Sequence, residues 1–178
     1  MIKKILTTQV IIIAAFVFAA AIIRLLSFQF EWWNFTPIGA MALFSGAYFK
    51  DKKMAFIVPL TAMILSDAII GFYNGIQVVY IAMCLVVLVG FLLQNRINIA
   101  SVIGGSLAAS VIFFLVTNFA LIYPETLYPH TVAGIITSYT AGLPFFKNTI
   151  MGDLIFSAVL FGAYQLVKRN VGTVVNAT

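Results

Sequence analysis

Long apolar runs separated by short polar loops make up nearly the whole chain. The longer runs cover residues 6–27, 50–74, 76–93, 97–123 and 145–167, and a shorter run covers 37–48. A helix rises about 1.5 Å per residue, so about twenty apolar residues cross the hydrocarbon core of a bilayer. The pattern therefore predicts an all-α membrane protein with six transmembrane helices, forming a single transmembrane domain over residues 1–178.

Two of the runs are short. The run at 37–48 reaches span length only if the helix starts at Asn34, and it is rich in small residues. Ala42 and Gly46 have the spacing that lets another helix approach closely, so we expect this helix to pack inside the bundle. Residues 132–143 are too few to span and are followed by Pro144. They predict a short re-entrant or interfacial helix on the outer side.

The first run has features of both a signal peptide and a membrane helix. Two lysines precede it, and the alanines at 19–21 resemble a cleavage site. The apolar run continues through Leu26, which is long for a signal peptide, so we expect an uncleaved first helix. Ala15 and Ala19 form a small-xxx-small pair, which suits contact with a partner helix, although alanine is equally ordinary on a lipid-facing surface.

Composition agrees with a membrane protein and indicates its orientation. Of the 178 residues, 63% are hydrophobic and 8% are charged, whereas soluble domains have about 25% charged residues. With six spans and a cytoplasmic N-terminus, the inner side receives Lys3, Lys4, Lys50, Lys52, Lys53, Arg96, Lys168 and Arg169. This asymmetry predicts both termini in the cytoplasm of a bacterial cell, with the chain in its inner membrane. The net charge of +5 therefore reflects topology, and we expect no nucleic acid as a partner.

Polar residues inside the apolar runs share the outer half of the predicted bundle. Arg24, Asp67, Asn118 and Asp153 all fall there, while the inner half is almost wholly apolar. A pocket open to the outside explains this bias. A buried ion pair between Arg24 and Asp67 or Asp153, holding the helices in register, is the competing explanation, and both can hold together.

Candidate ligand-binding residues follow from this geometry. They are Trp32, Trp33, Asn34, Asp67, Tyr80, Asn118, His130, Asn148 and Asp153. The paired tryptophans also suit the membrane–water interface, and otherwise they would cover a ligand at the mouth. The segment YPETLYPH, residues 123–130, is expected to act as a lid.

The sequence contains no arrangement typical of an enzyme. It has no catalytic triad, no HExxH, and no phosphate-binding glycine loop. Cys84 is the single cysteine, so an intramolecular disulfide and a cysteine-based metal cluster are excluded. A lone buried cysteine is usually a small hydrophobe, but a thiolate also binds soft metal centres. We therefore expect a protein that is not an enzyme and has no intrinsic cofactor.

Four segments resemble a bacterial integral-membrane family of unassigned function: residues 34–49, 59–73, 116–139 and 143–162. The pairs Ser66-Asp67, Thr117-Asn118 and Gly152-Asp153 are the most specific pieces. That family is similar to the substrate-binding S components of energy-coupling-factor (ECF) vitamin transporters. The resemblance implies a six-helix bundle that captures a micronutrient from outside and docks, through surfaces such as Ala15 and Ala19, onto an ATPase module. Solitary cobalamin-specific S components use a mid-chain cysteine as a cobalt ligand, and Cys84 is suitably placed for that role.

Two functions are thus expected from the sequence. The first is a membrane subunit or solitary transporter for a small vitamin-like molecule, with cobalamin as a possible transported ligand. The alternative is a non-transporting structural subunit of a larger membrane complex, surrounded by lipid and partner helices. A cavity lined by the outer polar residues distinguishes the first from the second.

Overall fold

The chain folds into a bundle of helices. The computed structural model describes the backbone of residues 2–175 and the side chains of residues 14–166, and these residues contain no strand. The elements are α1 (Ile2–Gln29), α2 (Ile38–Tyr48), α3 (Lys52–Ile70), α4 (Ile76–Leu93), α5 (Ile99–Thr117), the 3-10 helix η1 (Ala120–Ile122) and α6 (Val132–Val175). The prediction of an all-helical chain is confirmed.

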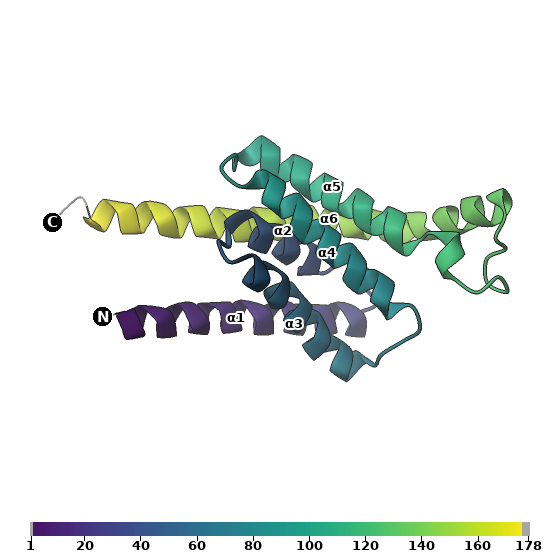
Figure 1. Cartoon of the computed structure of the whole chain (residues 1–178), viewed down its shortest axis with the longest axis horizontal. Coiled ribbons are helices and arrows are strands. Elements are labelled where there is room, and N and C mark those ends of the chain that lie inside the picture. The colour runs from purple at the N-terminus through teal and green to yellow at the C-terminus, as the bar shows by residue number, and fades with distance from the viewer. Residues whose placement is uncertain (1, 176–178) are drawn as a thin grey trace.

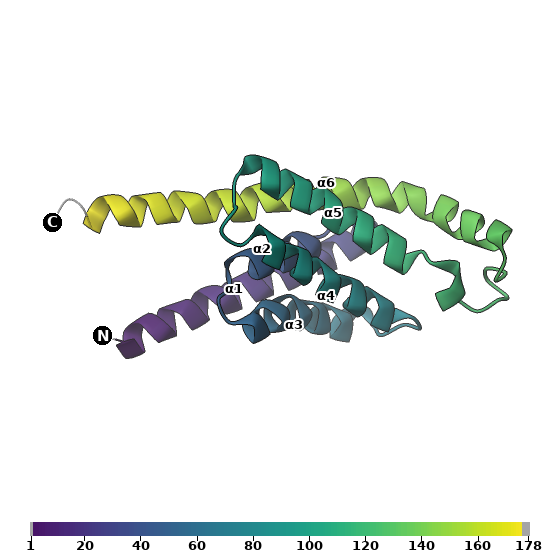
Figure 2. The ribbon, with the colours of Figure 1, turned by 45° about the horizontal axis from the view of Figure 1, so that its top comes forward.

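Helix α2 lies at the centre of the bundle. It packs against α3, α4, α5 and α6, and nine of its 11 residues are buried. Helix α1 packs mainly on α3, and α6 lies along α5 and α2. The helices alternate in direction, so the two ends of the chain lie at the same end of the bundle (Figures 1 and 2).

Glycine allows the closest helix contact. A Cβ atom added at Gly46 of α2 would lie 2.2 Å from the backbone oxygen of Val87, and one at Gly90 of α4 would lie 2.4 Å from that of Leu43. The two backbones therefore touch at a place where no larger residue fits. Such small-residue contacts are typical of helices that associate within a membrane.

Within the part of the chain whose side chains the structure describes, four helices are long and apolar enough to cross a membrane: α3, α4, α5 and the described part of α6. Helix α2 has 11 residues, which at about 1.5 Å per residue is roughly half the thickness of a hydrocarbon core. The prediction of a second span starting at Asn34 is therefore wrong. Residues 30–37 form turns and irregular structure, with Asn34 in the left-handed region at φ 63°, and the helix begins only at Ile38.

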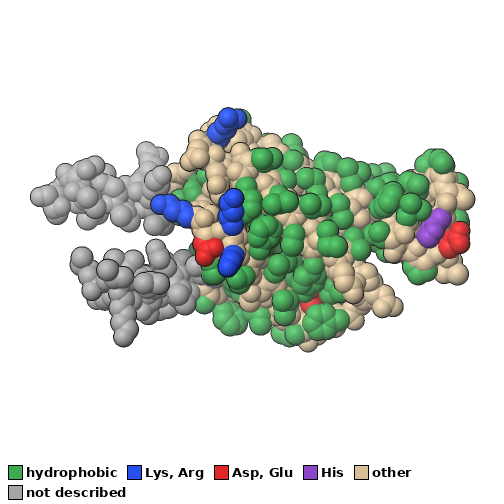
Figure 3. All heavy atoms as spheres, in the orientation of Figure 1, with side chains coloured by type: hydrophobic (Ala, Val, Ile, Leu, Met, Phe, Trp, Pro, Cys, Tyr) green, Lys and Arg blue, Asp and Glu red, His purple; other side chains and the backbone are tan. Residues whose placement is uncertain are grey.

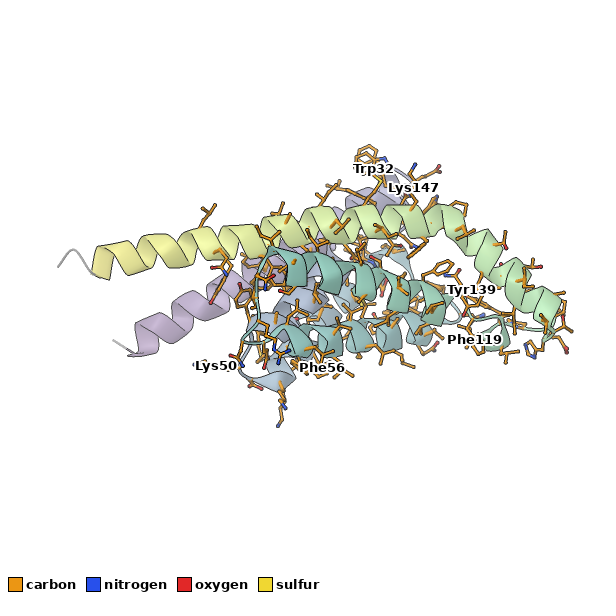
Figure 4. All side chains as sticks on the ribbon, turned by 90° about the horizontal axis from the view of Figure 1, so that it is seen from above. Trp32, Lys50, Phe56, Phe119, Tyr139 and Lys147 are labelled. Carbon is orange, nitrogen blue, oxygen red and sulfur yellow. The ribbon has the colours of Figure 1, made fainter. Side chains whose placement is uncertain are left out.

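Helix α6 is continuous over 44 residues. The prediction of a separate helix over 132–143, ended by Pro144, is wrong. A proline bends a helix without having to end it, and Figure 4 shows α6 bending near Tyr139. Contacts with α5 hold the first turns in place, because Ser138 Oγ donates to the Asn118 carbonyl at 2.7 Å and the Tyr139 hydroxyl donates to the Leu115 carbonyl at 3.0 Å.

The surface is divided along the long axis. Apolar side chains cover the middle of the face in Figure 3, Lys and Arg gather toward the end where the termini lie, and the single His lies beside an acidic side chain at the opposite end. This arrangement is consistent with a membrane protein. The side chains of Lys3, Lys4, Lys168 and Arg169, which the predicted orientation also counts, lie outside the described part.

Candidate functional site

A buried ion pair joins α1 to α3. Nη1 of Arg24 lies 2.5 Å from Oδ1 of Asp67 and 2.5 Å from Oγ of Ser66. The hydroxyl of Tyr80, on α4, donates to the other carboxylate oxygen, Oδ2, at 2.7 Å. Asp67 is fully buried, and each of its oxygens has a donor. The cluster therefore ties three helices together and leaves neither oxygen of Asp67 without a partner.

A cavity of about 410 Å³ lies beside this cluster. Its walls include residues from all six α-helices and from the loops at the end of the bundle away from the termini. The polar groups that line it include Arg24, Asn34, Thr36, Tyr73, Asn118 and Asp153, and its apolar lining includes Trp33, Met63, Val79, Met83, Phe113 and Phe145. A volume of this size is in the range of small-molecule binding sites.

Asp153 on α6 lies in the cavity wall and is 4% exposed. Its Oδ2 accepts a hydrogen bond from the Ser110 hydroxyl of α5 at 2.7 Å. Its Oδ1 packs against Gly39, where an added Cβ would lie only 2.2 Å away. Gly39 is the second residue of α2, so the carboxylate approaches the positive end of the α2 helix dipole. Asp153 therefore does not join the Arg24–Asp67 pair.

Two loops form the rim of the cavity. Residues 30–37 contribute Trp33, Asn34 and Thr36, and α6 braces this loop because Asn148 Nδ2 donates to the Trp33 carbonyl at 3.0 Å. Residues 71–75 contribute Tyr73 and Asn74, and this loop is bounded by two glycines with positive φ. Both loops lie at the end of the bundle opposite the termini.

Five of the predicted residues meet in the cavity: Arg24, Trp33, Asn34, Asn118 and Asp153. Asn118 uses its amide nitrogen within its own helix, donating to the Phe114 carbonyl at 2.9 Å. Its Oδ1 lies against Gly142 of α6, where an added Cβ would be 2.3 Å away. Asn118 therefore lines the cavity while also closing the α5–α6 contact.

The other predicted residues lie elsewhere. Trp32 projects away from the bundle (Figure 4) and is half-exposed. Tyr80 binds Asp67, Asn148 braces the rim loop, and His130 is exposed and contacts the Tyr123 carbonyl at 3.0 Å. The structure thus gives supporting positions to residues that the sequence suggests as direct ligands.

Cys84 lies half-buried on α4 and is not part of the cavity lining. The described residues contain no group of three or more His, Cys, Asp or Glu side chains that could hold a metal ion. The cavity therefore presents no cysteine to a metal-containing ligand.

Several lining residues were missed by sequence reasoning. Tyr73, Phe113 and Thr149 line the cavity, but in the sequence they are ordinary members of apolar runs or of their ends. Only the location of Tyr73, at the outer end of its apolar run and next to Asn74, could have indicated a place in the cavity wall. Burial raises the pKa of Tyr73, so its hydroxyl is a neutral hydrogen-bonding group at the rim.

The described residues form an all-helical chain with membrane-length helices around an internal cavity of about 410 Å³. The chain belongs to a family of unknown function, DUF6580, whose model matches residues 4–175. Neither a curated protein nor a solved structure matches the chain.

Proposed function

We propose that this protein is a multi-pass membrane protein that binds a small, vitamin-like molecule in the 410 Å³ cavity and delivers it inward. The observation that carries the proposal is the convergence of polar side chains from three helices (α1, α5 and α6) and two rim loops on one cavity within a chain that is mostly apolar. A polar residue inside a membrane helix is costly unless it has a partner or a function. A subunit that only fills space in a complex needs no such cavity.

In the proposed orientation, the mouth of the cavity faces the outside of the cell. Both termini lie at one end of the bundle (Figure 1), and the labelled Lys50 lies toward that end in Figure 4. With Lys and Arg facing the cytoplasm, the rim loops 30–37 and 71–75 face outward in the inner membrane of a bacterium. A ligand then enters from the outside, as the resemblance to S components of ECF transporters implies.

Cysteine labelling tests this orientation. In a Cys84→Ala background, Asn74→Cys lies at the cavity end and Asn95→Cys lies at the end of the termini. A maleimide that does not cross membranes is expected to label position 74 in intact spheroplasts and position 95 only after permeabilisation. The reverse pattern contradicts the proposal of an outward-facing mouth.

Energy for transport is proposed to come from a separate ATPase module. Ala15 and Ala19 on α1 are exposed, so a partner helix can approach this face closely. The same face also supports the alternative, a structural subunit of a larger membrane complex. Co-purification identifies the partner in both cases, and ligand binding separates the two.

Thermal unfolding in detergent tests the binding function. A ligand that binds only the folded state adds about 2.7 kcal/mol at roughly a hundredfold excess over its Kd. The panel contains vitamins and their precursors, with cobalamin included. Val79→Phe, which narrows the cavity, is expected to abolish the shift, and Leu88→Phe on the outer face of the same helix is expected to preserve it. A panel with no shift in the unaltered protein favours the structural-subunit alternative.

A further inference from the structure

The carboxylate of Asp153 is incompletely paired by the protein. Ser110 is the hydrogen-bond donor that the described residues supply to it, and this donor serves Oδ2. Among the described side chains, no fully enclosed polar atom lacks a partner. Oδ1 is therefore open to the cavity rather than sealed in the core, although the residue as a whole is only 4% exposed.

One element beside Asp153 favours a negative charge, whereas the burial of the carboxyl group disfavours it in the absence of a cation. The α2 helix begins beside it, and the first N–H groups of a helix carry a positive partial charge. Gly39 provides the space, because any side chain at that position would collide with Oδ1. The protein thus brings the carboxylate to a helix N-terminus but provides no ionised partner among the described residues.

The one cation in the described cavity wall is already used. Arg24 pairs with Asp67 across 2.5 Å, and that pair is neutral as a unit. Among the described residues, the ion pair of Arg24 is with Asp67, and none joins Arg24 to Asp153. Arg24 therefore does not pair with Asp153, and the described residues provide no cation for this buried carboxyl group in the α6 wall of the cavity.

The rest of the lining suits an apolar or aromatic body. Trp33, Tyr73, Phe113 and Phe145 all contribute to the wall. Aromatic faces attract organic cations, and the attraction strengthens where water is excluded. A hydrated metal ion gains little from such walls, and the described residues hold no cluster of metal ligands.

We propose that the ligand of this cavity is a small organic cation with an N–H group that donates to Oδ1 of Asp153, while its apolar or aromatic body lies against the aromatic wall. The inference rests on the proposed small-molecule function and names the chemical class of its substrate. A ligand of this class supplies the cation that the described residues do not provide, and a cation beside Asp153 favours the ionised form of its carboxyl group.

A charge-matched series tests the proposal on the unaltered protein. Benzylammonium, benzyl alcohol and benzoate share one aromatic body and differ in charge, and they are titrated at millimolar concentration with thermal unfolding as the readout. The cation is expected to stabilise the protein and to bind at least about 10-fold more tightly than the alcohol, with benzoate weakest. If benzylammonium and benzyl alcohol bind equally well, or if benzyl alcohol or benzoate binds more tightly than benzylammonium, the cation proposal is overturned but a small-molecule site remains. If no member of the series binds and no compound of the vitamin panel shifts the melting temperature, both the cation proposal and the proposed small-molecule function are rejected.

The Asp153→Asn variant locates the selectivity. A hydrogen bond to a charged group justifies an expected loss of about 10- to 100-fold in affinity for the cation, with the affinity for the alcohol unchanged within about threefold. Glu125→Gln removes the same charge from an exposed loop at the same end and is expected to change neither affinity. If the variant retains cation selectivity, Asp153 is not the recognising group. If the variant does not fold, the charge series on the unaltered protein still decides the question.

Discussion

Two buried carboxylates in one small bundle differ in the hydrogen-bond and ion-pair partners that the protein gives them. Asp67 receives Arg24 on one oxygen and the Tyr80 hydroxyl on the other. Asp153 receives one serine hydroxyl and lies at a helix N-terminus with its second oxygen facing the cavity. Both residues are at most 4% exposed, so burial alone does not distinguish them; the number of partners does.

We propose that this difference in partners separates a structural carboxylate, Asp67, from a ligand-binding one, Asp153. A buried ion pair with all its hydrogen bonds made fixes helices in register, and removing one partner leaves a costly unpaired charge. A buried carboxylate with one unpaired oxygen lowers the free energy of unfolding. In our proposal, a ligand supplies the missing partner. We therefore expect the Asp67 cluster to determine whether the protein folds and Asp153 to determine what it binds.

The largest effect is expected from breaking the ion pair. Arg24→Met leaves Asp67 buried without its cation and should lower the free energy of unfolding by about 3–5 kcal/mol. Reversible denaturation in mixed micelles measures the change. The double variant Arg24→Met/Asp67→Leu removes both charges and should recover a large part of the loss. A single variant as stable as the unaltered protein would contradict a structural role for this pair.

A smaller loss is expected at Tyr80. Tyr80→Phe removes the donor to Oδ2 of Asp67 and should cost about 1.5–3 kcal/mol, since the acceptor is charged and buried. The matched control is Tyr164→Phe, at an exposed tyrosine for whose hydroxyl the described residues provide no hydrogen bond. If Tyr80→Phe changes cation affinity but not stability, Tyr80 belongs to the binding site as the sequence suggests.

The contact between α2 and Asp153 gives the next test. Gly39→Ala places a Cβ about where Oδ1 now lies, so the carboxylate must move; overpacking of this kind costs about 1–3 kcal/mol. Ligand binding should weaken with it. Gly104→Ala is the control, because nothing lies within 4 Å of its added Cβ and alanine favours a helix by up to about 1 kcal/mol. Unchanged ligand affinity in Gly39→Ala would separate Asp153 from binding.

The smallest effect is expected at Cys84, which lies outside the cavity lining. Cys84→Ala should leave the ligand-induced shift unchanged and alter stability by less than about 1 kcal/mol, because the side chain is only partly buried. A shift with cobalamin that disappears in this variant would instead favour a thiolate bound to cobalt.

Much of the fold is readable from the sequence, because each apolar run is bounded by polar or turn residues. The two errors have a common cause. Pro144 does not end α6, since Ser138 and Tyr139 bind the backbone of α5 and hold the preceding turns. The second apolar run does not extend back to Asn34, since residues 30–37 form the rim loop that α6 braces through Asn148. Both outcomes depend on contacts between segments far apart in the chain.

The candidate site is readable in part. Topology alone places Arg24, Asn118 and Asp153 at one depth, and the three line one cavity. Topology does not say which carboxylate Arg24 selects, because that depends on how α1 and α6 rotate around α2. Tyr73 and Phe113 carry no signal in the sequence, since aromatic residues in apolar runs are as common on lipid-facing surfaces as on cavity walls.

A single melting experiment on two carboxamide variants tests the distinction most directly. Asp67→Asn and Asp153→Asn are compared with the unaltered protein, each with and without saturating benzylammonium. The account predicts that Asp67→Asn melts at a much lower temperature but keeps a cation-induced shift, while Asp153→Asn melts within a few degrees of the unaltered protein and loses the shift. The exchanged pattern, with binding lost at Asp67 and stability lost at Asp153, would contradict it.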